Sequence, residues 1–238
     1  MHSVREERPK PNDQKVWDAY WEDSGYRGKW LYDGIAACYR QFIIRPALNY
    51  FVFRYFPSRV CVLHAGCGSG QVDVQISKAM HLTAIDISGT ALRKYALCHQ
   101  TPVNLLQGTI DRLPILDRSY DAIFNLGVME HFKTAELERI FCEFNRVLKT
   151  SGKIILFWPP VYGLSVRVLA IVQRLLSRTL KNPVKLHPEE HTLVRSREQI
   201  EALLKLAGFV LCDYYFGVRD LFTHQVIVAE KVAETRYD

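Results

Sequence analysis

From residue 60 onward, short apolar runs alternate with stretches in which apolar residues recur every three or four positions. The first pattern is typical of buried strands and the second of amphipathic helices. Strand and helix in regular alternation indicate a parallel sheet joined by right-handed crossovers. We predict strands near residues 60–64, 82–86, 103–107, 120–125 and 153–158, with helices near 70–79, 88–98 and 134–149.

The pattern changes after residue 195. A helix is predicted near residues 196–207, and two apolar strands follow at 209–217 and 222–230. The link between these strands, around Arg219 and Asp220, is too short for a crossover, so the two strands should pair antiparallel.

The segment before residue 57 has a different character. Residues 1–11 are polar and charged, and we expect them to form a flexible arm. A helix is predicted from Asn12 or Asp13, and a longer aromatic-rich helical pattern covers about 33–55, where Pro46 should split or kink it. Five aromatic side chains of this helical cap either belong to its core or roof a ligand site: Trp17, Tyr20, Trp21, Trp30 and Tyr32.

Residues 159–195 form an insertion between the fifth predicted strand and the next helix. It starts with a strongly apolar stretch whose cations fall on one stripe of a helix, at Arg167, Arg174, Arg178 and Lys181. The length of this stretch and its arginines exclude a transmembrane span. Two interpretations stay open: a lid that packs over the site with its cations in water, or an interfacial helix at about 164–181 that touches anionic lipid or an amphiphilic substrate.

The strongest chemical signal is a glycine-rich turn between the first predicted strand and the helix after it. Gly66, Gly68 and Gly70 occupy alternate positions there, and glycine lets the backbone approach a ligand closely. Asp86 ends the second strand, where a carboxylate would meet a ribose diol. A dinucleotide fingerprint would need a glycine at Gln71. These features together indicate a nucleoside cofactor that is not a dinucleotide.

Further segments extend this pattern along the core: Asp86-Ile87-Ser88, then 113–121, 128–131, 146–152 and 207–209. With the glycine turn, this ordered series resembles the class I S-adenosylmethionine-dependent methyltransferases, particularly the type 11-like group that acts on small molecules and lipids. The resemblance covers roughly residues 57–230.

The resemblance implies an α/β, Rossmann-like fold: a seven-stranded, mostly parallel sheet of order 3-2-1-4-5-7-6, with strand 7 antiparallel and helices on both faces. We expect one domain over residues 1–238, with the arm at 1–11, the helical cap at 12–56 and the lid insertion at 159–195. The Rossmann-like core then consists of 57–158 and 196–232.

The resemblance also implies the cofactor, S-adenosyl-L-methionine, and its product, S-adenosyl-L-homocysteine. The glycines should approach the aminocarboxypropyl arm, Asp86 should accept both ribose hydroxyls, and Ile87 should lie against adenine. The full set of expected cofactor-binding residues is His64, Ala65, Gly66, Cys67, Gly68, Gly70, Asp86, Ile87, Thr109, Ile110, Asn125 and Leu126.

Two of these residues depart from the family pattern. His64 stands where the family usually has a carboxylate that helps to hold the cofactor's ammonium group, and a neutral imidazole there accepts one hydrogen bond without a fixed charge. Thr109 stands where an aspartate often faces the adenine amino group. We expect cofactor binding that is intact but weaker, with a dissociation constant on the order of micromolar.

Methyl transfer needs alignment first, and a base only when the acceptor arrives protonated. His131, preceded by Glu130, and His191 are the candidates for this role. Each histidine is equally consistent with a structural role, in which it bonds a backbone carbonyl. No spacing supports a metal site at Glu130 and His131, and we predict none.

Composition narrows the remaining choices. The chain has 238 residues and a formal net charge of +6, which is common among soluble proteins and also suits an anionic partner. The six cysteines lack a paired Cys-x-x-Cys spacing, so neither structural zinc nor a disulfide framework is expected. The first ten residues are too polar for a signal peptide, and we expect a cytoplasmic protein.

The sequence therefore favours a methyltransferase that acts on a small or amphiphilic organic acceptor by direct in-line displacement. Two alternatives stay open. One is an RNA methyltransferase, suggested by the net charge but without an RNA-binding signature. The other is a non-catalytic, cofactor-binding partner subunit, suggested by His64 and Thr109. The sequence does not identify the acceptor or the oligomeric state.

Overall fold

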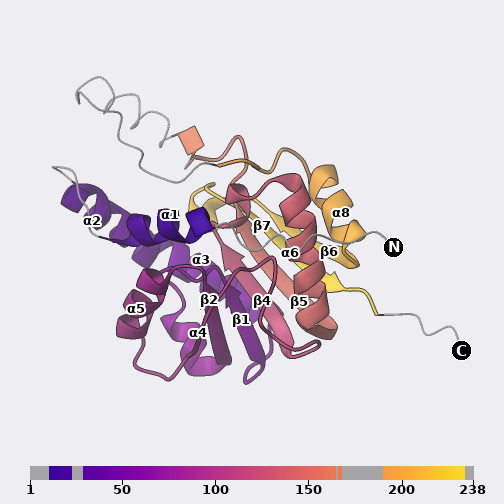
Figure 1. Ribbon diagram of the computed structural model, residues 1–238. Coiled ribbons are helices and arrows are strands. Elements are labelled where there is room, and N and C mark those ends of the chain that lie inside the picture. Colours follow the sequence, from indigo (N-terminus) through magenta and orange to yellow (C-terminus); the bar gives the residue numbers. More distant parts are fainter. Residues whose placement is uncertain (1–10, 23–28, 165, 168–189, 234–238) are drawn as a thin grey trace, which may run out of the picture.

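The computed structural model describes residues 11–22, 29–164, 166–167 and 190–233. A seven-stranded sheet forms its centre, in the order β3-β2-β1-β4-β5-β7-β6 (Figure 1). The strands are β1 Cys61–Ala65, β2 His81–Asp86, β3 Asn104–Gln107, β4 Tyr120–Leu126, β5 Leu148–Trp158, β6 Phe209–Tyr215 and β7 Gln225–Lys231. Strand β7 runs opposite to the other six described strands. This confirms the predicted fold class and strand order.

Helices cover both faces of the sheet. Packing against one face are α6 (Thr134–Val147) and α8 (Arg197–Leu206), and against the other α3 (Arg45–Tyr55), α4 (Val74–Ala79) and α5 (Gly89–Cys98). The strand pleat divides the core accordingly. In β1, for example, Leu63 faces the α6 side while Val62 faces the α3 side, and both are fully buried.

The helical cap consists of α1 (Pro11–Trp21), α2 (Lys29–Tyr39) and α3. A π-helical turn, η1 (Arg40–Ile44), joins α2 to α3. The irregularity expected at Pro46 therefore lies in the turn just before it. Proline has no N–H to donate to the preceding turn, so the regular pattern of helical bonds is interrupted there. Pro11, expected in the arm, is instead the first residue of α1. The rest of the expected arm and most of the insertion, including most of its predicted basic helix, lie outside the described residues.

Three predicted boundaries were wrong. The helix after the glycine turn begins at Val74 rather than 70, because Gly70 adopts a left-handed conformation and Asp73 only precedes the helix. Strand β5 begins at Leu148 rather than 153, since Leu148 already pairs with Tyr120. The turn between β6 and β7 is longer than predicted and holds the 3₁₀ turn η3 (Val218–Asp220).

Candidate functional site

The glycine turn lies at the carboxyl end of β1, at the edge where parallel sheets bind ligands. Gly68 has φ +53°, and a Cβ added there would lie 2.8 Å from Cζ2 of Trp21. Gly70 has φ +68°, and its Cβ would overlap the ring of Tyr95. Both positions therefore need glycine for conformation and for space. The result is a loop whose backbone is open to close approach.

Asp86 ends β2 and faces this loop. Its Oδ2 accepts a hydrogen bond from the Gly68 N–H at 2.8 Å, and its Oδ1 accepts one from the Ser88 N–H at 2.9 Å. Burial raises the pKa of Asp86, while these two backbone bonds oppose the rise. A carboxylate offers about four lone-pair sites. Two acceptor sites are therefore left for a ligand diol.

A buried polar network lies beneath the loop. Asp73 is fully buried, and its Oδ2 accepts hydrogen bonds from His64 Nδ1 and the Tyr95 hydroxyl, each at 2.6 Å. Its Oδ1 lies 3.1 Å from His99 Nε2, which is also 3.0 Å from the Gly70 carbonyl oxygen. Burial acts to raise the pKa of Asp73, but His64 and the other hydrogen bonds outweigh it and hold that pKa well below its usual range.

This network fixes the orientation of His64. With Nδ1 donating to Asp73 and the ring stacked on Phe124 at 4.2 Å between centroids, Nε2 is the remaining polar edge of the imidazole. In the neutral ring that edge is an acceptor. The contact with Asp73 could not be predicted, because Asp73 precedes a helix and looks like an ordinary cap.

Asn125 brings a second acceptor to the same edge of the sheet. Its Nδ2 donates to the Ala65 carbonyl oxygen at 2.5 Å, and its fully buried Oδ1 has no partner among the described residues. Buried polar atoms normally have partners. An orphaned acceptor beside the glycine turn therefore suits a ligand with N–H or O–H groups.

The other expected cofactor residues surround this edge. Gly108, at the end of β3, donates its N–H to the Asp86 carbonyl oxygen, which brings half-buried Thr109 and buried Ile110 close to the end of β2. Ile87 and Leu126 are half-buried, and Cys67 is buried. Burial raises the pKa of the Cys67 thiol well above its ordinary value, so it is not a reactive thiolate.

The three candidate bases differ in their surroundings in the structure. Glu130 is buried, and its Oε2 has no hydrogen-bond partner among the described residues. Burial raises its pKa to about 8, with a further contribution from the charge of Glu190. His131 Nε2 lies 3.9 Å from Glu130 Oε1. His191 contributes its backbone N–H to the Glu130 carbonyl oxygen, and its side chain is exposed.

Helix α1 lies over the site. Trp21 contacts the glycine turn, and Trp17 packs edge-on against His131 with 5.0 Å between ring centroids. Asp18, which sequence reasoning missed, accepts a hydrogen bond from the Ser88 hydroxyl at 2.6 Å. Trp17 and Trp21 thus lie over this edge of the sheet, which is one of the two roles that the sequence left open for the aromatic side chains of the cap. The side chains of Trp30 and Tyr32 lie outside the described part of the chain.

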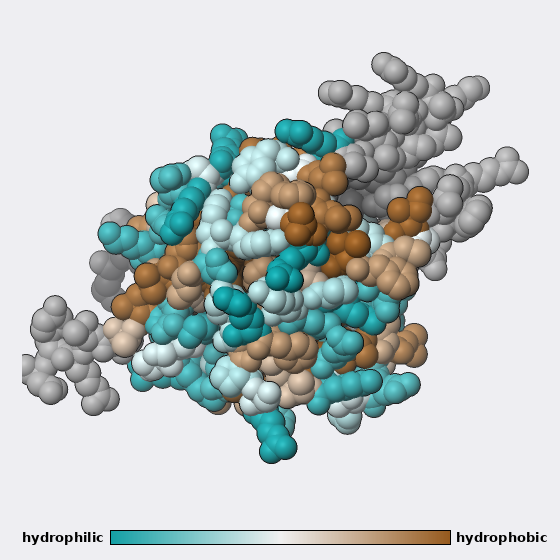
Figure 2. Space-filling view, turned by 180° about the vertical axis from the view of Figure 1, so that it is seen from behind, coloured by the Kyte–Doolittle hydropathy of each residue, from teal (hydrophilic) through white to brown (hydrophobic). Residues whose placement is uncertain are grey.

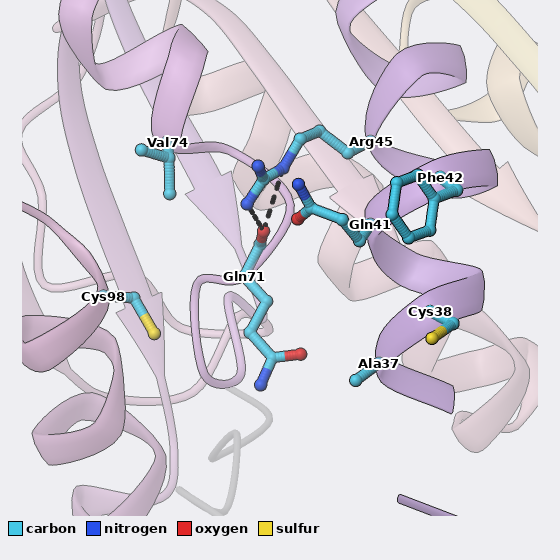
Figure 3. A pocket seen from close by; sticks show the side chains of 8 residues that line it. All are labelled: Ala37, Cys38, Gln41, Phe42, Arg45, Gln71, Val74 and Cys98. Atoms are coloured by element: carbon cyan, nitrogen blue, oxygen red, sulfur yellow. Dashed lines mark hydrogen bonds between the residues drawn. The ribbon is translucent and has the colours of Figure 1, made fainter. Parts of the chain in front are cut away.

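A separate cavity of about 440 Å³ lies behind the glycine turn (Figure 3). The α2–η1 segment forms one wall of this cavity, and Gln71 and Val74 lie across from it. Cys38 and Cys98 lie on opposite sides of the cavity. Arg45 reaches across it, and its Nη2 donates to the Gln71 carbonyl oxygen at 2.5 Å. Neither Asp86 nor a glycine of the turn lines this cavity, so we do not assign it to the cofactor.

Comparison with known proteins points to one kind of domain. A family model described as "Methyltransferase domain" matches residues 63–156, which include the glycine turn, Asp86 and Asn125. These residues carry a methyltransferase domain, and the match covers less than half of the chain. A Mycobacterium tuberculosis protein described as a probable S-adenosylmethionine-dependent methyltransferase is 28% identical over 164 residues, 66% of this chain. This chain spans about half, 53%, of that relative's length.

Solved structures show the same methyltransferase fold. A SAM-dependent methyltransferase from Methanosarcina mazei superposes with a TM-score of 0.61 and 20% identity, over 77% of this chain and 98% of that one. Magnesium protoporphyrin IX methyltransferase from Synechocystis, with bound S-adenosylhomocysteine, gives a TM-score of 0.59 and 16% identity, over 93% and 95%. S-adenosylmethionine is thus the cofactor of this class of domain.

Two further observations concern the described residues of the methyltransferase domain and its cap. No group of three or more histidine, cysteine, aspartate or glutamate side chains among them is arranged to hold a metal ion. None of their helices is long and apolar enough to cross a membrane.

Proposed function

We propose that this domain transfers a methyl group from S-adenosylmethionine to a small or amphiphilic organic acceptor by direct in-line displacement. The observation that carries the proposal is the facing pair of Asp86 and the glycine turn. Asp86 is buried and already oriented by Gly68 and Ser88, and it keeps acceptor sites for a ribose diol. The turn beside it leaves no room for any side chain larger than hydrogen at Gly68 or Gly70.

The remaining cofactor residues take complementary roles. Bound S-adenosylmethionine supplies an electrophilic methyl group on a sulfonium centre. His64 Nε2 and Asn125 Oδ1 accept hydrogen bonds from the ammonium group of the cofactor, since both atoms are acceptors near the turn. Asp73 supports His64 through Nδ1, so a negative charge stands behind the imidazole in place of a carboxylate at position 64. Ile87, Thr109 and Ile110 line the adenine side.

On the acceptor side, Glu130 and His131 are better placed than His191. A buried carboxyl with a pKa near 8 exchanges its proton close to neutral pH, which suits removal of a proton from a hydroxyl or amine acceptor. In such a transfer the acceptor forms its bond to the methyl carbon, the sulfur–carbon bond breaks, and the acceptor's proton passes to the Glu130 carboxylate. His131, beneath Trp17, orients the acceptor.

Calorimetric titration with S-adenosylhomocysteine tests the cofactor half of the proposal. We expect binding on the order of micromolar in the wild type and none in Asp86→Ala, while Asp117→Ala, a change at an exposed loop carboxylate, should bind as the wild type. The His64→Ala variant should lose affinity for S-adenosylhomocysteine but not for 5′-methylthioadenosine, which lacks the ammonium group. No binding by the wild-type protein would overturn the proposal.

An acceptor panel tests the second half. Turnover with phenols, quinone precursors or lipid-like alcohols would support a small-molecule acceptor. Turnover with RNA alone would favour the RNA methyltransferase instead, and its binding should then weaken steeply with salt. Tight S-adenosylhomocysteine binding without turnover on any acceptor would favour the non-catalytic partner subunit.

A further inference from the structure

Apolar side chains gather on the surface where β5 leaves the sheet and where β6 turns into β7. Six of them, between 39% and 69% exposed, form what we call the η3 patch: Val161, Tyr162, Leu164, Val218, Leu221 and Phe222. In the view of Figure 2, apolar side chains gather in the upper part of the surface, with polar residues below them and to their left. Soluble monomers rarely expose contiguous apolar patches of this kind without a function.

The patch is continuous although its residues come from two distant segments. The Leu164 N–H donates to the Phe222 carbonyl oxygen at 2.9 Å. Phe216 joins the two sides, because its ring lies edge-on to Tyr162 at 5.0 Å and 5.4 Å from that of Phe222. Tyr162, Leu164 and Phe222 therefore share one surface, and the other three residues of the patch lie within four positions of them in sequence.

The backbone that presents this surface is strained. Leu221 and Phe222 both have φ +58°, in the left-handed region that bulky residues avoid. Such conformations persist only where the surrounding structure holds them, and they concentrate at functional sites. Here the Phe222 N–H donates to the Gly217 carbonyl oxygen, and Thr223 and His224 bond Asp220. The strain keeps two large apolar side chains at the surface.

The charged residues that flank the patch in sequence are two exposed cations and one buried acid. Arg167 and Arg219 are exposed at its borders. The only carboxylate within residues 159–167 and 214–225 is Asp220, which is fully buried and bonded to its own turn. An apolar surface with exposed arginines beside it and its nearby aspartate buried complements an anionic lipid bilayer, which has a negatively charged surface and an apolar interior.

We propose that the η3 patch docks the protein onto the surface of an anionic lipid bilayer. The patch lies at the carboxyl edge of β5, where Trp158 pairs with Gln225 of β7, and this is the sheet edge that also holds the glycine turn. Docking would turn the acceptor side of the domain toward the bilayer. One of the two interpretations that the sequence left open places lipid contact at about 164–181, most of which lies outside the described part. The η3 patch instead combines the first residues of the insertion with η3 and its neighbours.

Vesicle co-sedimentation of the full chain tests the proposal. We compare vesicles of phosphatidylcholine alone with vesicles of phosphatidylcholine and phosphatidylglycerol in equal parts. The wild type should bind the mixed vesicles and lose that binding in high salt. Val218→Glu and Leu221→Glu should each weaken it by about tenfold, since each puts a charge into the apolar layer. Leu97→Glu, at an exposed leucine of α5, is the matched control and should bind as the wild type.

Three results would overturn the docking proposal. They are no binding of the wild type to mixed vesicles, unchanged binding in both η3 variants, and a wild-type dimer that Val218→Glu converts to a monomer, which would assign the patch to a second copy of the chain. Titration of each variant with S-adenosylhomocysteine in the same preparations shows whether the protein is folded. It also separates failure of the lipid proposal from failure of the proposed function, because docking does not require cofactor binding.

Discussion

Asp18 of α1 is bonded to Ser88, seventy residues later in the chain, through a 2.6 Å hydrogen bond between its Oδ1 and the serine hydroxyl. The same Oδ1 accepts the Thr90 N–H at 3.2 Å. Ser88 also caps its own helix by accepting the Ala91 N–H. One short segment thus starts α5 and fastens the cap helix that carries Trp21 over the glycine turn.

Removing this connection should loosen the roof of the cofactor site. We expect Asp18→Ala to speed dissociation of S-adenosylhomocysteine about fivefold, because a capping carboxylate contributes about 1 kcal/mol. Stopped-flow tryptophan fluorescence measures the rate. Glu22→Ala changes an exposed acid one turn along α1 and should leave the rate unchanged. Equal rates in all three proteins would show that α1 does not cover the bound cofactor.

Glycine is required at position 70 but not at position 34. Gly70→Ala places a methyl group against Tyr95 at φ +68°, so we expect a loss of roughly 2–4 kcal/mol in the free energy of unfolding. Gly34 lies inside α2 with open space around it, so Gly34→Ala should stabilise by about 0.5–1 kcal/mol. Urea unfolding of both variants checks the signs. A well-tolerated Gly70→Ala would contradict the close packing of the turn on Tyr95.

Glu130 should make stability depend on pH near neutrality. Its pKa is about 8 in the folded protein because of burial, above the ordinary value of 4.5. The folded state therefore binds more protons than the unfolded state between these values, and stability falls as pH rises from about 4.5 through 8. Each unit by which the pKa of Glu130 is raised corresponds to roughly 1.4 kcal/mol in the free energy of unfolding. Glu130→Gln mimics the protonated form, so the variant should lack this contribution to the pH dependence.

Unfolding free energies at about pH 5 and about pH 9 measure the effect. The advantage of Glu130→Gln over the wild type should grow with pH. Glu138→Gln, at an exposed position of α6, should follow the wild-type pH dependence. Parallel curves for the wild type and Glu130→Gln would show that Glu130 is ionised or hydrogen-bonded in the folded protein at neutral pH.

The sequence predicted best the features that are encoded locally. Gly66 directly follows the first apolar strand and Asp86 ends the second, so their place at the strand ends could be predicted from neighbouring residues. The antiparallel β6–β7 pair followed from the short link between two apolar segments, although that link proved longer than expected. The sheet order came from the family resemblance, since no local pattern states which strands are neighbours.

Contacts between distant segments could not be predicted. Asp18 looks like one more polar residue on an amphipathic helix, and Asp73 like an ordinary helix cap. Their roles depend on Ser88 and His64, which the fold alone brings near. The left-handed pair at Leu221 and Phe222 was equally hidden, because bulky apolar residues carry no sequence signal for a positive φ.

The position of β7 between β5 and β6 has a consequence for the order in which the chain can fold. Strand β6 is synthesised before β7, yet its only neighbour in the sheet is β7. Until residues 225–231 emerge, the five strands that carry the glycine turn end at β5, whose outer edge is unpaired. The nascent protein therefore exposes a long apolar strand edge while its cofactor half is already complete, and this interval is when it is most prone to aggregate.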